Sequence, residues 1–101
     1  MSFQEKVRTD IAAATPLSAS QAWDPPATAA TQGAEVSTTV SVPGANVGDP
    51  VVVGHSGIAA ADAVILTALV ATANIVTVNI TNTTAAAVNV ASGTLNVRVL
   101  K

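Results

Sequence analysis

The residues of this chain that come nearest to a catalytic motif are Gly54-His55-Ser56-Gly57, which place a hydroxyl group beside the only histidine. The nucleophile elbow of α/β-hydrolases has the pattern G-x-S-x-G, in which a glycine follows the serine by two residues. Ile58 occupies that position here. A catalytic triad also needs a histidine that folds back onto the serine from a distant segment. Because His55 is adjacent to Ser56, we expect no catalytic residue and no enzymatic activity.

Metal, cofactor and phosphate sites are also disfavoured by the residue spacing. The middle of the chain offers His55, scattered carboxylates and no cysteine, which is not a ligand pattern for zinc or calcium. The segment Gly44-Ala45-Asn46-Val47-Gly48-Asp49 has the glycine spacing of a phosphate loop, but neither a lysine nor a predicted helix follows it. We expect turns there, and a solvated loop histidine at position 55. His55 could hold an ion only if copies met on a three-fold axis.

The charge distribution excludes further classes of partner. The chain has only four Lys and Arg residues, and none lies between Arg8 and Arg98. A nucleic-acid surface needs several phosphate-neutralising cations on one face, so we expect no nucleic-acid partner. The most apolar run, residues 63–73, is about half the length of a membrane span, so we expect no membrane partner.

The alternation of residues predicts the elements that carry these segments. Residues 36–42 place Val36, Thr38, Val40 and Val42 on one face of a strand, with Ser and Thr on the other. Pro43-Gly44 then predicts a turn. Residues 64–72 predict a strand that is apolar on both faces, with Ile65 and Leu69 on the second face. A turn at Ala73-Asn74 and a return strand over 75–81 complete a hairpin.

The remaining segments predict further short strands. Candidates are residues 17–23, which end before Asp24-Pro25-Pro26, and residues 51–53 and 94–100. Residues 54–63 and 82–93 are expected to be loops, and the second could hold a short strand at Val88 to Val90. This spacing of strands and turns predicts an all-β fold, a small antiparallel β-sandwich or jelly-roll-like domain over residues 17–101.

Residues 1–16 form a separate N-terminal arm by composition. Phe3, Val7 and Ile11 follow a helical spacing that ends at Pro16, and four charged residues lie among them. No apolar stretch typical of a secretory signal is present there. The arm is either a frayed terminus or a segment that becomes ordered when it docks on a neighbour.

The aromatic content bears on how the domain is stabilised. Trp23 is the only tryptophan. We expect it to pack over the end of the sheet, and the alternative is a contact at a subunit interface, where tryptophan is enriched. A core built mostly of Ala and Val buries little area per side chain, at roughly 25 cal/mol per Å², so burial between subunits would add stability.

The order of the turn motifs carries a family resemblance. Ala22-Trp23-Asp24-Pro25-Pro26 is followed by a Ser/Thr-Val strand, by Val42-Pro43-Gly44-Ala45-x-x-Gly48-Asp49, and by an apolar strand. The pattern ends with residues 75–82, I-V-T-V-N-I-T-N, and residues 91–99, A-S-G-T-L-N-V-R-V. Over residues 20–101 it resembles small β-rich structural proteins of tailed bacteriophages, of the capsid decoration or cement type. Residues 1–16 have no counterpart in this pattern.

The resemblance implies a virion protein without a catalytic site. It implies a homotrimer on the capsid surface, with the major capsid protein as partner. The expected capsid contacts are Phe3, Lys6, Val7 and Arg8. The expected subunit interface includes Trp23, Ile65 and Leu69. The alternative is a tail, collar or fibre module that joins virion proteins or binds a host glycan.

Overall fold

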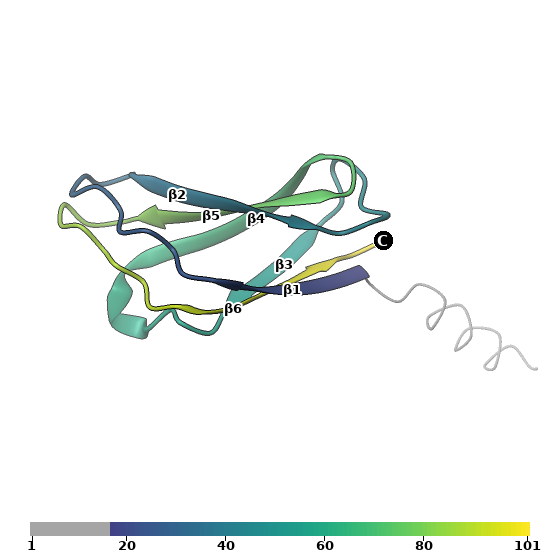
Figure 1. Cartoon of the computed structure of the whole chain (residues 1–101). Helices are drawn as coiled ribbons and strands as arrows, with labels where there is room; N and C mark the ends of the chain where they lie inside the picture. The colour runs from purple at the N-terminus through teal and green to yellow at the C-terminus, as the bar shows by residue number, and fades with distance from the viewer. Residues whose placement is uncertain (1–16) are drawn as a thin grey trace, which may run out of the picture.

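The computed structural model describes residues 17–101, which form two three-stranded antiparallel sheets packed as a sandwich (Figure 1). The elements are β1 Leu17–Trp23, β2 Glu35–Ser41, β3 Val51–His55, the 3-10 turn η1 Ala60–Asp62, β4 Val64–Thr72, β5 Ile75–Asn82 and β6 Gly93–Val99. One sheet has the strand order β1-β6-β3 and the other β2-β5-β4. The predicted all-β sandwich is confirmed.

Alternating apolar residues of both sheets build the core between them. The buried cluster consists of Val40, Val42, Ala45, Val70, Val76, Val78, Leu95, Val97 and Val99. The predicted inward faces of residues 36–42 and 75–81 are therefore correct. Since most of these side chains are valines, the two sheets can approach closely, but each side chain contributes little buried area.

The hairpin of β4 and β5 was predicted correctly, and its turn also fastens a distant loop. Asn74 adopts the left-handed conformation, with φ 68, which Asn tolerates better than most residues. Its Oδ1 accepts a hydrogen bond from the Gly44 amide at 2.8 Å, and its own amide donates to the Ala45 carbonyl at 2.8 Å. Gly44 itself has φ 95, so Pro43-Gly44 turns the chain against the tip of this hairpin.

Two long loops at the opposite end of the sandwich are joined through Asn82. This side chain is fully buried, and its Nδ2 donates to Thr28 Oγ1 at 3.1 Å, to the Ala29 carbonyl at 3.2 Å and to the Ala86 carbonyl at 2.8 Å. Its Oδ1 accepts from the amide and the hydroxyl of Thr84. The network links residues 24–34 to residues 83–92 and satisfies the polar groups that the loops bury.

The possible strand at Val88 to Val90 is wrong. Val88 exchanges hydrogen bonds with Thr28, through its carbonyl to the Thr28 amide at 2.9 Å and through its own amide to Thr28 Oγ1 at 3.0 Å. This single point of contact is a link between loops and not a ladder. Val90 is buried beneath them. Val88 and Val90 are therefore loop residues at the end of the core.

Candidate interaction surfaces

The outer side of the β2-β5-β4 sheet is a nearly uncharged surface, which we call the β4 face. Rows of paired residues cross it, such as Glu35–Thr81–Ile65, Ser37–Asn79–Thr67 and Thr39–Thr77–Leu69. Glu35 is the only charged residue in these rows, and its carboxylate accepts a hydrogen bond from Thr81 Oγ1 at 3.2 Å. The β4 face therefore offers hydroxyl, amide and apolar groups with little charge to desolvate.

Ile65 and Leu69 are the apolar residues of β4 that point outward on this face. Their exposed fractions are 53% for Ile65 and 47% for Leu69, whereas Val70 on the same strand is buried. Within residues 17–101, β4 is also an edge strand, since it pairs with β5 alone. Edge strands with exposed apolar residues and no charge are prone to pair with other chains. Two of the residues predicted for a subunit interface thus share one accessible surface.

Trp23 lies elsewhere in the fold. It ends β1 in the other sheet, is partly buried, and packs against the core. Its ring meets the His55 ring edge-on, with centroids 5.8 Å apart and an interplanar angle of 81°. The structure therefore does not bring Trp23 together with Ile65 and Leu69. This placement agrees with the packing role expected for Trp23, and its part in an interface stays a prediction.

The prediction that His55 is a solvated loop residue is wrong. His55 ends β3 and is buried. Its Nε2 lies 2.9 Å from the Trp23 carbonyl, and its Nδ1 accepts from the Gly57 amide at 3.2 Å. Because a carbonyl oxygen can only accept, Nε2 must carry the proton, and the ring is the neutral tautomer. Nε2 therefore joins β3 to the end of β1, and Nδ1 holds the turn that follows β3.

Ser56 and Gly57 hold the segment after β3 against the segment that leads into β6. Ser56 Oγ accepts a hydrogen bond from the Thr94 amide at 2.8 Å, which fixes it to the start of β6. A Cβ atom on Gly57 would lie 2.1 Å from the Ala91 carbonyl oxygen, and one on Gly93 would lie 2.5 Å from the Gly57 amide nitrogen. The motif that resembled a nucleophile elbow is therefore a close contact between two backbone segments.

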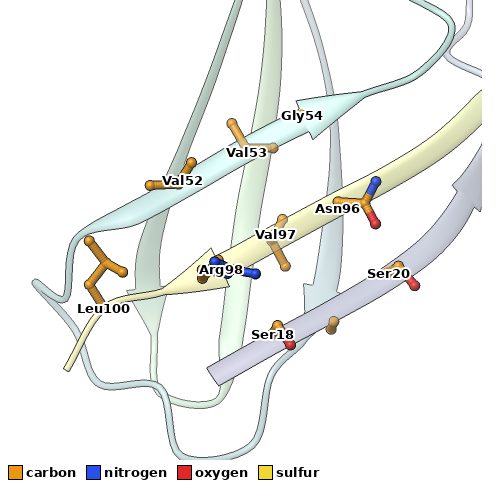
Figure 2. Close-up of a pocket in the computed structure, with 10 residues that line it drawn as sticks. Ser18, Ser20, Val52, Val53, Gly54, Asn96, Val97, Arg98 and Leu100 are labelled. Carbon is orange, nitrogen blue, oxygen red and sulfur yellow. The ribbon is translucent and has the colours of Figure 1, made fainter. Parts of the chain in front are cut away.

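An open groove of about 780 Å³ crosses the outer side of the β1-β6-β3 sheet (Figure 2). We call it the β6 groove. Its outward side chains come from the three strands and the segment after β6: Ser18, Ser20, Val52, Asn96, Arg98 and Leu100. The sequence carried no signal that these strands pair around a hollow, because that depends on which strands become neighbours.

The remaining sequence predictions concern the capsid contacts, a metal site and a membrane partner. The candidate capsid contacts Phe3, Lys6, Val7 and Arg8 lie outside the described residues. Over residues 17–101, no group of three or more His, Cys, Asp or Glu side chains is arranged to hold a metal ion. No helix within that range is long and apolar enough to cross a membrane. Comparisons with protein-family models, curated proteins and solved structures gave no match.

Proposed function

We propose that this chain is a structural protein of a tailed bacteriophage. In this proposal it binds the outer surface of the capsid as a homotrimer, with the major capsid protein as its partner, and stabilises the shell. The observation that supports it best is the β4 face, an extended surface with exposed Ile65 and Leu69 and one charged residue. Exposed apolar groups gathered on one face favour contact with protein.

The β4 face serves contacts between protomers in this proposal, and the N-terminal arm serves the capsid. A trimer carries three arms, so each arm can bind weakly while the whole trimer stays attached, because the second and third contacts are intramolecular. Phe3 and Val7 would supply apolar contacts to the capsid, and Lys6 and Arg8 would supply charge. Such a trimer clamps neighbouring capsid subunits together.

The experiment that tests the function locates the protein on the particle. Purified full-length protein is mixed with capsids that lack it and with complete tailed particles, and both are imaged by cryo-electron microscopy. We expect density at many equivalent positions on the capsid surface, and capsids that disassemble at a higher temperature. Density confined to the tail or collar would reject the proposal in favour of a tail, collar or fibre module.

The role of the arm is tested by paired substitutions in the full chain. Phe3→Ser with Val7→Ser should lower the affinity for capsids at least tenfold in a sedimentation assay, because apolar anchors often contribute more than about 1 kcal/mol each. The matched control is Gln4→Ser with Thr9→Ser, which changes polar residues of the same segment and should leave the affinity unchanged. Equal affinities for the two variants would remove the arm from the capsid contact.

A further inference from the structure

The β6 groove has a defined chemistry from one end to the other. Arg98, on the central strand β6, pairs with Ser18 on β1 and with Val52 on β3, so these three residues form one row across the sheet. Two residues along, Asn96 lies between Ser20 and Gly54. Nothing lies within 4 Å of the position that a Cβ on Gly54 would occupy, so the sheet surface is hollow at this point. Figure 2 shows these side chains along the three strands.

The groove presents apolar groups and a cation at the same end. Val52 is 59% exposed and Leu100 is 38% exposed, and both flank Arg98. Among residues 17–101 the ion pair present is Lys101 with Asp49, so the Arg98 guanidinium has no carboxylate partner within that range. An occupant that fits this surface would bring apolar side chains and a single carboxylate close together.

We propose that residues 1–16 of the same chain occupy the β6 groove. The segment joins the sheet where the groove begins, because Leu17 starts β1 opposite Val99, and Ser18 lies opposite Arg98. The C-terminal end of the chain lies at the same end of the sandwich (Figure 1). The short connection gives the arm a high effective concentration at this surface.

The length of the arm matches that of the groove. Sixteen residues in a helix extend about 24 Å, at 1.5 Å per residue. The seven residues of β1 extend about 23 Å, at 3.3 Å per residue. An arm that folds back at Thr15-Pro16 could therefore lie along the whole sheet.

The sequence of the arm places a carboxylate beside its apolar stripe. Phe3, Val7 and Ile11 fall on one side of a helix, and Asp10 follows Val7 by three residues, which makes the two neighbours on the helix surface. With Ala14 over Leu17, Asp10 lies about 6 Å further along the helix. Arg98 lies opposite Ser18, about 3.3 Å along the sheet from Leu17, so its long side chain can reach the Asp10 carboxylate. The pairing of Asp10 with Arg98 sets the register, while the apolar stripe covers Val52 and the hollow at Gly54.

This inference concerns the free protein and does not depend on the proposed function. Phe3 and Val7 cannot contact the groove and a capsid at the same time, so a docked arm would have to leave the groove before it bound a capsid. The experiments below use no capsid. Their failure would leave the capsid assays intact, and failure of the capsid assays would leave the docked arm intact.

Disulfide trapping tests the position of the arm. The chain has no cysteine, so two introduced cysteines can react only with each other or with another copy. Val7→Cys with Asn96→Cys should form a disulfide within one chain at least tenfold faster than Val7→Cys with Asn79→Cys. Asn79 is the matched control because it lies on the outer side of the central strand of the other sheet. Equal rates, or disulfides that link two chains, would overturn the assignment.

A charge exchange tests the register in the full chain. Arg98→Asp should lower the hydrogen-exchange protection of residues 3–14 about fivefold, the equivalent of roughly 1 kcal/mol for a partly exposed ion pair. Adding Asp10→Arg should restore the protection, whereas adding Glu5→Arg should not, because residue 5 lies away from the apolar stripe. If Arg98→Asp changed nothing, or if Asp10→Arg failed to rescue it, the proposed pairing would be wrong.

Discussion

Asn82 illustrates a residue whose role depends on distant contacts. Its fully buried side-chain amide forms hydrogen bonds with Thr28, Ala29, Thr84 and Ala86. The sequence placed position 82 at the start of a polar loop and gave no reason to expect burial, because Thr28 and Ala29 come from a loop more than fifty positions earlier. The Asn-x-Thr spacing of Asn82 and Thr84 is the one local signal, since such side chains bond to the backbone two residues on.

Removing this amide should be costly. Asn82→Ala leaves the Thr84 amide without its partner and removes one hydrogen bond each from Thr28 Oγ1, the Ala29 carbonyl and the Ala86 carbonyl, so we expect the free energy of unfolding to fall by about 2–3 kcal/mol. Urea denaturation followed by Trp23 fluorescence measures the change. Asn79→Ala is the control on the same strand, because that side chain faces outward, and it should change stability by less than about 0.5 kcal/mol. Equal losses for the two variants would show that the network adds nothing.

Asp49 gives a prediction about pH. The hydrogen bond from Lys101 Nζ, at 2.9 Å, lowers the pKa of the Asp49 carboxyl below its usual range, and the hydrogen bond from the Asn46 backbone amide lowers it further. A carboxyl whose pKa is lower in the folded state stabilises the fold above its unfolded pKa, and this contribution is lost as the pH falls through the folded value. Asp49→Asn should therefore lower Tm slightly at pH 6 and not at all near pH 2.

Thermal unfolding from pH 2 to pH 7 measures this difference. The pair is solvent-accessible, so 1 M NaCl should reduce the difference between the two proteins at pH 6. Asp24→Asn is the control, since it removes a carboxylate that is exposed in the loop after β1. A Tm difference that stayed constant over the whole pH range would mean that the charge of Asp49 is not involved.

At the scale of the elements, the alternation of apolar and polar residues predicted individual strands and a hairpin. It did not predict the contacts that join one strand or loop to another. The hairpin of β4 and β5 follows from period-two patterns on both sides of Ala73-Asn74, and β2 follows in the same way. The sequence did not predict how the loops pack. His55 appeared solvated because the sequence does not show that its ring would meet Trp23 from another strand. Glycines 57 and 93 looked like loop residues, although they permit a close approach of two backbones.

The turn after β3 lies against the backbone of the loop before β6, so Gly57 should tolerate no side chain. In Gly57→Ala the new Cβ would lie 2.1 Å from the Ala91 carbonyl oxygen, so a backbone segment must move, and we expect a loss of about 2–3 kcal/mol. The emission of Trp23, the only tryptophan, should shift to the red as the contact with His55 loosens. Gly54→Ala is the control. Its Cβ would have open space, so stability should be unchanged or slightly higher. Equal stability of the two variants would contradict the close contact.

At the scale of the whole molecule, the sandwich presents two outer sheet surfaces of different character. The β6 groove is hollow, carries a cation and lies beside the N-terminal arm. The β4 face is nearly neutral and carries Ile65 and Leu69. The sequence predicted the second surface from a strand that is apolar on both faces. It could not predict the first, since a groove arises only when β1, β6 and β3 come together in that order.

The proposed homotrimer makes the β4 face a direct target. In Ile65→Lys with Leu69→Lys, two charges would have to be buried at each interface, which costs several kcal/mol without a partner for either charge. We therefore expect the wild-type chain to be a trimer at micromolar concentration by multi-angle light scattering, and the double variant to be a monomer. Both positions are exposed in the protomer, so circular dichroism should show an unchanged fold. Val47→Lys is the control, since Val47 is 66% exposed but lies in the loop before β3, and this variant should remain a trimer. A monomeric wild-type chain would reject the trimer itself, whereas a trimeric double variant would move the interface to another surface.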